Sequence, residues 1–125
     1  MLAYVTIGTT DLQRGAAFYD AIAAELGAAR VMEFDRFIAW GRPGGEPGIG
    51  LTYPFDGNPA SVGNGVMVAL AAKDEEQVRR IYEIALANGG SDEGPPGLRE
   101  GGFFAAYFRD RDGNKLNAIC MPASA

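Results

Sequence analysis

The feature that most constrains this chain is an internal repeat, in which equivalent residues lie 63 positions apart. Four pairs have this offset, and each pair occupies the same place in its own half. They are Tyr4 and Met67 in a first strand, Asp11 and Asp74 at a helix start, Tyr19 and Tyr82 within that helix, and Gly27 and Gly90 at its end. Because a repeated sequence unit is expected to fold as a repeated structural unit, the chain is expected to contain two similar halves.

The first half predicts one helix among short strands. Thr10 and Gln13 have the spacing of a capping box, with Thr10 as the N-cap, and apolar residues then recur at helical spacing until Gly27. Alternating and branched residues predict strands at 2–8, 31–34, 37–40 and 49–53. A segment rich in glycine and proline at 41–48 is expected to connect the last two strands.

The second half begins with a predicted strand at 66–70. A second capping box follows, in which Asp74 is the N-cap and Gln77 reaches back, and this helix is expected to stop at 88–90. A loop with two adjacent prolines is predicted at 94–99.

A hairpin is predicted to close the chain at 103–120. In its first strand Phe104 and Phe108 lie on one face, and in its second strand Leu116 and Cys120 share a face. The residues at 112–114 are of types that tolerate positive φ, which favours a tight turn between the two strands.

These elements predict an α+β fold built from two tandem βαβββ modules. The length of 125 residues fits a single domain with a proper core. Module 1 is expected at about 1–56, a polar linker at about 57–63, and module 2 at about 64–122.

The absence of histidine excludes several kinds of active site. Zinc sites built from histidine are excluded, as are Ser-His-Asp and Cys-His nucleophile arrangements. Cys120 is the only cysteine, which excludes an intrachain disulfide and zinc sites built from several cysteines. A single cysteine is also typical of a protein of the reducing cytoplasm, where we expect this chain to reside.

Charge and hydropathy narrow the range of partners. The formal net charge is −5, and no cluster of five or six basic residues is present, so neither nucleic acid nor a membrane surface is an expected partner. The run at 2–7 resembles a strand and follows no basic segment, and no apolar stretch is long enough to cross a bilayer. We therefore expect neither a signal peptide nor a membrane span.

On its motifs the chain resembles the vicinal oxygen chelate superfamily, which includes glyoxalase I, extradiol dioxygenases and bleomycin resistance proteins. The most specific segments are 5–12, 17–20, 97–99 and 107–116, where Arg111 replaces the usual proline of the turn. The resemblance implies the glyoxalase/bleomycin resistance/dioxygenase fold, in which two βαβββ modules form a curved mixed sheet around a pocket.

The resemblance also implies where a divalent metal would bind. The family ligands, commonly His or Gln, Glu, His and Glu, correspond here to Tyr4, Gly50, Met67 and Asn117. Gly50 has no side chain, Met67 offers a soft thioether, and the other two offer neutral oxygens. We therefore expect that the family metal site has been lost, and that the protein holds no metal and no other cofactor.

The pocket wall can be extended from these positions by strand alternation. The expected ligand-binding residues are Tyr4, Thr6, Gly50, Thr52, Met67, Tyr107, Asn117 and Arg99. The neighbours that alternation adds to Tyr4 and Asn117 are mostly small and apolar, with phenols, threonines and one amide in the lining, which suits a weakly polar organic molecule held by shape, stacking and a few hydrogen bonds. They are Thr6, Gly48, Thr52, Ala69, Tyr107 and Ile119.

Three of these assignments have alternatives that the sequence leaves open. Asn117 either hydrogen-bonds a ligand or satisfies a neighbouring tyrosine hydroxyl. Arg99 either clamps a carboxylate or is an exposed loop charge. Trp40, the only tryptophan, belongs either to the core or to the pocket.

The leading functional hypothesis is a metal-free protein that binds a small organic molecule, similar in mode to the drug-sequestering resistance proteins. The alternative is a lyase, isomerase or dioxygenase relative acting without the His/Glu metal site, in which Tyr4, Tyr107 and Asn117 polarise a carbonyl. Whether the chain is an enzyme stays open, and no catalytic residue is assigned.

A third hypothesis is a degenerate dimerisation or interaction module. The resemblance also implies a homodimer, either side by side or swapped.

Overall fold

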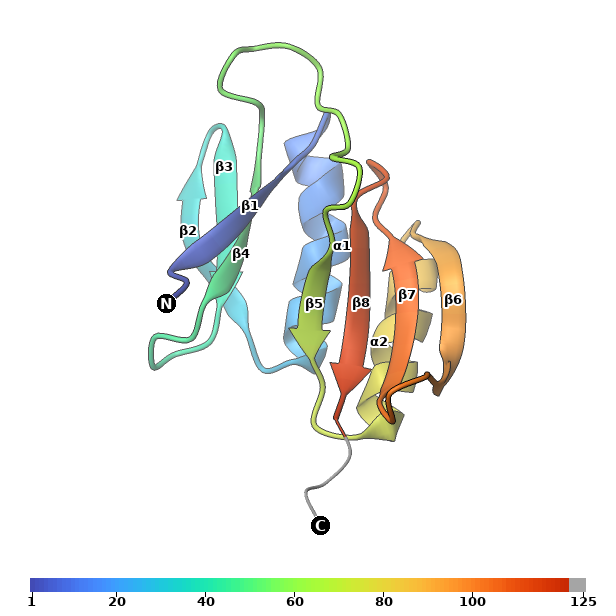
Figure 1. Ribbon diagram of the computed structural model, residues 1–125. Coiled ribbons are helices and arrows are strands. Elements are labelled where there is room, and N and C mark those ends of the chain that lie inside the picture. Colours follow the sequence, from blue (N-terminus) through green and yellow to red (C-terminus); the bar gives the residue numbers. More distant parts are fainter. Residues whose placement is uncertain (122–125) are drawn as a thin grey trace.

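The computed structural model describes residues 1–121, which form two four-stranded sheets, each covered on one face by a helix (Figure 1). In Figure 1 the first sheet lies on the left and the second on the right. The two helices pack against each other and join the modules. The eight strands therefore belong to two separate sheets that share one layer of helices.

The two modules have the same element order and the same sheet topology. The first comprises β1 (Tyr4–Gly8), α1 (Leu12–Glu25), β2 (Ala29–Phe34), β3 (Phe37–Gly41) and β4 (Gly48–Thr52), with sheet order β1-β4-β3-β2. The second comprises β5 (Val68–Ala71), α2 (Glu75–Ala87), β6 (Ser91–Leu98), β7 (Phe104–Arg109) and β8 (Lys115–Cys120), with sheet order β5-β8-β7-β6. In each module the first and last strands pair in parallel and the other pairs are antiparallel. The predicted α+β fold with a duplicated βαβββ unit is confirmed.

The boundary between the sheets falls between the end of β4 at Thr52 and the start of β5 at Val68. The linker predicted at 57–63 lies within this stretch, which passes over the top of the molecule in Figure 1. The expected end of module 2 at residue 122 lies outside the described residues.

One hydrophobic core lies between the helices and the sheets. Phe18 of α1 reaches across to Phe108 of β7, with ring centroids 6.3 Å apart, so the first helix contributes to the core of the second module. Phe104, Phe108 and Leu116 are buried on the face that meets α2, which confirms the predicted faces of the hairpin.

The two helix starts differ in how well they were predicted. Asp74 caps α2 by accepting from the Gln77 N–H at 2.8 Å, as predicted. The prediction that Thr10 caps α1 is wrong, because Asp11 accepts from the Arg14 N–H at 3.1 Å instead. The Thr10 N–H and hydroxyl both donate to the Asp112 carboxylate, at 2.9 and 3.0 Å.

The helix ends show that the internal repeat shifts by one residue. Gly27, with φ of 70°, follows the C-cap of α1, whereas the equivalent residue after α2 is Gly89, with φ of 94°. The predicted pairing of Gly27 with Gly90 is therefore wrong at this point. The reason is that α2 is one residue shorter than α1.

The loop predicted at 94–99 is wrong for most of its length, because β6 extends to Leu98. This strand pairs with β7 only on one side and has register shifts between Asp92 and Gly94 and between Gly94 and Gly97. Proline is compatible with an edge strand or a bulge, since neither position requires an N–H donor. The two prolines therefore interrupt the ladder without ending the strand.

The connection between β7 and β8 is a five-residue loop built around the buried carboxylate of Asp110. Its Oδ1 accepts the N–H groups of Asp112 and Asn114, both at 2.9 Å. Its Oδ2 accepts the Asn114 side-chain amide at 2.9 Å and the Tyr19 hydroxyl at 2.7 Å. In the loop only Gly113 has a positive φ, and its N–H donates to the Asp110 carbonyl at 3.1 Å, so the chain reverses direction at the predicted place between two antiparallel strands.

The same loop ties module 2 to module 1. The Asn114 amide also donates to the Gly8 carbonyl at the end of β1, at 2.8 Å. Asp112 accepts from the Thr9 hydroxyl at 2.7 Å and from Thr10, just before α1. The loop therefore fixes the end of β1 and the start of α1 against the second sheet.

We predict that Tyr19→Phe lowers the free energy of unfolding by about 2 kcal/mol at pH 7, because it removes a hydrogen bond to a buried carboxylate. Burial, followed by the charge of Asp110, raises the pKa of Tyr19 well above its ordinary value of 10.0. The unfolded chain thus releases this proton near pH 10 while the folded chain keeps it, so stability falls as the pH rises above about 10. Urea unfolding across alkaline pH should show a shallower fall in the variant.

Tyr82→Phe is the matched control. The Tyr82 hydroxyl donates to Asp92 at 2.9 Å at an exposed position, so its loss should cost much less. Equal losses of unfolding free energy in the two variants would mean that the buried hydrogen bond from Tyr19 to Asp110 contributes no more to stability than the exposed one from Tyr82 to Asp92.

Candidate functional site

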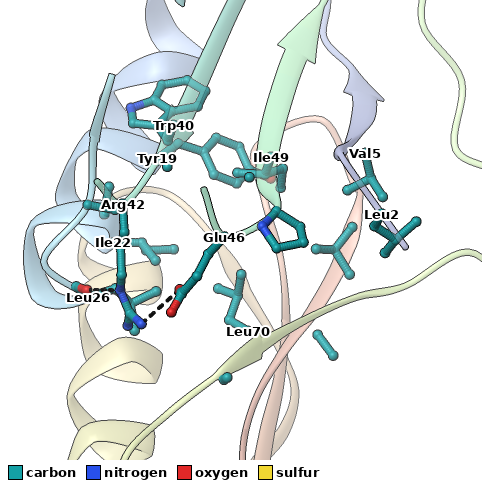
Figure 2. Close-up of a pocket in the computed structure, with 18 of the residues that line it drawn as sticks. Leu2, Val5, Tyr19, Ile22, Leu26, Trp40, Arg42, Glu46, Ile49 and Leu70 are labelled. Atoms are coloured by element: carbon teal, nitrogen blue, oxygen red, sulfur yellow. Dashed lines mark hydrogen bonds and ion pairs between the residues drawn. The ribbon is translucent and has the colours of Figure 1, made fainter. Parts of the chain in front are cut away.

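A cavity of about 530 Å³ lies between the two modules (Figure 2). Its wall combines one face of α1, the neighbouring parts of β1, β3 and β4, and strand β5 of the second module. The larger apolar side chains on this wall include Val5, Tyr19, Ile22, Leu26, Ile49 and Leu70. Such a volume, with a mostly apolar wall, is in the range of sites for small organic molecules.

The helical side of the cavity comes from the spacing of residues on α1. Tyr19, Ile22 and Leu26 lie three and four positions apart and so project from the same face of the helix. The sequence assigned these residues to a buried helical stripe. Helical periodicity could not tell which part of that stripe contacts the core and which part borders a cavity.

The polar groups of the wall lie at the connection between β3 and β4. Arg42 donates from Nε to the Leu26 carbonyl at 2.7 Å and pairs with the Glu46 carboxylate at 3.1 Å (Figure 2). The sequence analysis identified 41–48 only as a turn. Its role at the cavity depends on α1 lying beside it, and the local sequence carries no signal of that.

Trp40 belongs both to the core and to the cavity wall. It is buried, its ring centroid lies 5.4 Å from that of Tyr19, and its indole N–H donates to the Asp20 carboxylate at 2.8 Å. In Figure 2 the two rings lie together at the upper end of the cavity. The question left open by the sequence is thus answered, since the ring contributes to both.

The acceptor for Trp40 is held in its charged form. The Arg30 guanidinium contacts Asp20 at 2.8 Å, and hydrogen bonding to it is the main cause that lowers the pKa of this carboxyl below its ordinary value of 3.8. Burial opposes this shift, and the bond from Trp40 adds to it. A charged acceptor therefore fixes the orientation of the indole at neutral pH.

Of the eight residues expected to bind a ligand, Met67 alone borders this cavity. Four of the others lie on the face of the first sheet that points away from α1. They are Tyr4, Thr6, Gly50 and Thr52, with Thr6 directly opposite Gly50 in the ladder. Tyr4 is half exposed, at 50% of its surface, and Thr52 donates to the Arg36 and Tyr53 carbonyls.

The sequence analysis missed the aromatic side chain that covers Gly50. A Cβ atom at Gly50 would lie 2.5 Å from the nearest ring carbon of Phe37, so the ring occupies the space above this glycine. The Phe37 and Tyr4 rings meet edge to face, with centroids 6.1 Å apart. Strand alternation alone could have placed Phe37 on this face, but not over Gly50.

The remaining three residues form a second cluster on the open face of the second sheet. Asn117 lies directly opposite Tyr107 in the ladder. The Arg99 guanidinium lies over the Tyr107 ring, 5.4 Å from its centroid, and donates to the Pro95 carbonyl at 2.6 Å. The ammonium of Lys115, which the sequence analysis did not select, lies 5.5 Å from the same centroid.

Asn117 is the one polar side chain whose buried oxygen lacks a partner within residues 1–121. Its exposure is 1%, and its Oδ1 accepts no hydrogen bond from the protein. The suggestion that Asn117 satisfies a tyrosine hydroxyl is therefore wrong. The hydroxyl of Tyr19 donates to Asp110, and that of Tyr82 to Asp92.

Neither a metal-binding cluster nor a membrane-spanning helix is found among the described residues. No three side chains of the His, Cys, Asp and Glu types at residues 1–121 are grouped so that they could hold a metal ion. Neither helix in this part of the chain has the length and apolar character needed to cross a membrane.

Comparison with solved structures confirms the fold. A glyoxalase/bleomycin resistance protein from Albidiferax ferrireducens T118 has 36% sequence identity and a TM-score of 0.89, covering 98% of this chain and 99% of its own. A glyoxalase-related enzyme from Fulvimarina pelagi has 23% identity and a TM-score of 0.78, covering 98% and 88%. A glyoxalase/bleomycin resistance protein/dioxygenase family enzyme from Burkholderia phytofirmans PsJN has 19% identity and a TM-score of 0.78, covering 95% and 97%. The last two likenesses establish the fold alone.

No curated protein matches the chain. The sequence model of the Glyoxalase/Bleomycin resistance protein/Dioxygenase superfamily matches residues 1–118. Together with the paired βαβββ modules, this match confirms the resemblance identified from the motifs: the chain belongs to the glyoxalase/bleomycin resistance protein/dioxygenase superfamily.

Proposed function

We propose that this protein binds a small, weakly polar organic molecule in the cavity between its two modules. The observation that carries the proposal is the cavity of about 530 Å³, whose wall is apolar apart from the Arg42–Glu46 pair and a few polar atoms. Burial of apolar ligand surface against Ile22, Leu26 and Leu70 would supply most of the affinity. The Arg42–Glu46 pair would orient one polar group of the ligand.

We further propose that the metal site of the family has been lost in this chain. Tyr4 and Gly50 lie on the first sheet and Asn117 on the second, and the Phe37 ring fills the space above Gly50. A carboxylate side chain at position 50 would have to displace the Phe37 ring. These residues therefore do not fit a divalent ion.

The enzyme alternative has less support than the binding function. It requires Tyr4, Tyr107 and Asn117 to reach one carbonyl group, yet Tyr4 belongs to the first sheet and the other two to the second. No proton-transfer pair borders the cavity, among the described residues, apart from the ion-paired Glu46 and the hydroxyl of Tyr19. That hydroxyl is already bonded to Asp110.

A direct test uses the uncharged dye N-phenyl-1-naphthylamine and the single tryptophan. Because Trp40 borders the cavity, dye bound there should quench its fluorescence with a stoichiometry of one per chain. We expect Ala71→Phe, at the β5 wall, to weaken dye binding about tenfold or more by filling the cavity. Native mass spectrometry of the protein as purified would identify any molecule that it retains.

The control is Ala17→Phe, which makes the same change at an exposed position of α1 away from the cavity. Its affinity for the dye should equal that of the unmodified protein. Dye binding that is the same in all three proteins, or that never quenches Trp40, would rule out the cavity as the binding site.

A second prediction concerns the Phe37 ring. Gly50→Ala should lower the free energy of unfolding by about 1–3 kcal/mol, because its Cβ would overlap the ring. Phe37→Leu in the same chain should recover part of this loss, and the coupling can be measured by a double-mutant cycle in urea. Gly41→Ala is the control, since a Cβ there would meet Val31 only at 3.8 Å. An equal loss at both glycines would contradict the proposed overlap.

We also propose that the protein forms a homodimer through the open face of its first sheet. Tyr4, Val31, Met32 and Phe34 are exposed there, and Phe34 exposes 66% of its surface. Contiguous exposed apolar side chains commonly mark an interface between proteins.

Phe34→Glu should shift the protein to a monomer in sedimentation velocity experiments, because it would place a charge within that interface. Leu98→Glu, at a side chain that is 74% exposed on the edge of the second sheet, should leave the dimer intact. A monomeric parent protein at micromolar concentration would refute the dimer, and dissociation of both variants would refute the assignment to the first sheet.

A further inference from the structure

We propose that the cavity between the modules binds an extended, uncharged molecule with a peptide-like backbone, which lies along the free edge of β5. The inference rests on the function proposed above, because it concerns the same cavity, and it names the class of molecule that the cavity takes. Its basis is that a strand edge, and not only a set of side chains, borders the cavity.

Strand β5 has a ladder partner on only one side. It pairs in parallel with β8 and is the outermost strand of its sheet, on the side that faces the first module (Figure 1). An edge strand presents a row of N–H and C=O groups that have no partner in the sheet. These groups are available to a ligand wherever a cavity reaches the edge.

The cavity follows this edge rather than one face of the strand. Five consecutive residues, 67–71, border it. Because successive side chains point to opposite faces of a strand, a wall against one face would include only every second residue. Val68 and Leu70 pack against the core, whereas Ala69 and Ala71 are exposed, so the cavity reaches both faces of β5. The strand edge is where the two faces meet.

The bonds to β8 show which main-chain groups face the cavity. The Ala72 N–H donates to the Ile119 carbonyl of β8 at 2.9 Å. Main-chain groups of successive residues point to alternate sides of a strand, so those of Leu70 also face β8 and those of Ala69 and Ala71 face away from it. Within residues 1–121 the N–H and C=O groups of these two alanines take part in no hydrogen bond. Two donors and two acceptors therefore lie along the cavity side of β5.

These groups have the spacing of a peptide backbone. Residues 69 and 71 lie about 7 Å apart, and an extended peptide repeats its outward amide groups at the same interval. Such a ligand would exchange N–H···O=C bonds with both alanines, in the way that a peptide adds a strand to an open sheet edge. The stretch 67–71 spans about 13 Å, which suits a ligand of about three residues.

The wall beside the edge favours apolar side chains on the ligand. Val68 and Leu70 border the cavity on the core side of the edge, and Ile22 and Leu26 of α1 form another part of the same wall (Figure 2). Every second side chain of an extended ligand points to the same side, so two apolar side chains separated by one residue would pack here. A charged ligand terminus would lose its hydration against this wall, which favours an uncharged molecule.

The test uses N-acetyl leucyl-alanyl-leucine N-methylamide, added to the full chain, with amide hydrogen exchange followed by NMR. The N–H groups of Ala69 and Ala71 should exchange at least about fivefold more slowly with saturating tripeptide than without it. The Leu70 N–H, which faces β8, should be protected in both states. Protection confined to the outer edge strands β2 or β6, or no binding at millimolar concentration, would overturn the proposal.

A comparison compound isolates the main-chain bonds. In a depsipeptide analogue, esters replace the two amides that carry the leucine N–H groups, so the apolar side chains are kept and two donors are lost. It should bind at least about fivefold more weakly than the tripeptide. Equal affinities would mean that the apolar wall alone selects the ligand, against the role assigned to the strand edge.

Ala69→Pro removes one donor from the protein side. Proline is compatible with an edge strand where the N–H faces away from the ladder, so the variant should fold and should bind the tripeptide about fivefold or more weakly. Ala69→Val is the matched control, because it adds similar bulk and retains the N–H, and its affinity should equal that of the unmodified protein. Equal weakening in both variants would contradict a bond from this N–H. The exchange measurement on the unmodified protein decides the matter even if the proline variant fails to fold.

The dye separates this proposal from the function on which it rests. N-phenyl-1-naphthylamine needs no main-chain bond, so Ala69→Pro should bind it as the unmodified protein does. Dye binding without tripeptide binding would reject the peptide-like ligand and leave the cavity as a binding site. Absence of both from the unmodified protein would reject the cavity itself.

Discussion

The buried carboxylate of Asp110 is the interaction on which the arrangement of the two modules depends. A buried carboxylate needs several donors, and Asp110 receives them from its own loop and from Tyr19 of the first helix. Because the Tyr19 ring also borders the cavity, the same bond that fixes the modules positions part of the cavity wall. The Tyr19 side chain therefore connects the packing of the two modules to the wall of the proposed binding cavity.

Elements whose apolar residues recur at a regular spacing could be predicted from the sequence. Elements whose geometry depends on residues far away in the chain could not. The alternation of Phe104, Phe108 and Leu116 is set by one buried face, so the faces of β7 and β8 were correct. The start of α1 was not, because the choice between Thr10 and Asp11 depends on Asp112, which lies far away in the sequence. Strand β6 was missed because its bulges remove the alternation that marks a strand.

The candidate site was predictable to a similar extent. Period-two alternation led us to expect Asn117 and Tyr107 on one common side, and likewise Thr6 and Gly50, and the ladders place the members of each pair directly opposite one another. It could not predict that the strands divide into two separate sheets, since the angle between sheets is set by the packing of α1 against α2. The cavity residues of α1 and the 41–48 segment thus became recognisable only with the fold in place.

The two open faces treat the former metal positions in opposite ways, and the contrast argues for different roles. On the first sheet the absence of a side chain at Gly50 is compensated by the Phe37 ring, and within residues 1–121 no buried side-chain oxygen or nitrogen on that sheet is left without a partner. On the second sheet Asn117 keeps a buried oxygen without a donor, which costs about 1–3 kcal/mol. Proteins are stable by only about 5–15 kcal/mol, so a cost of this size in a chain that could carry leucine at the same position favours a bound partner over simple packing.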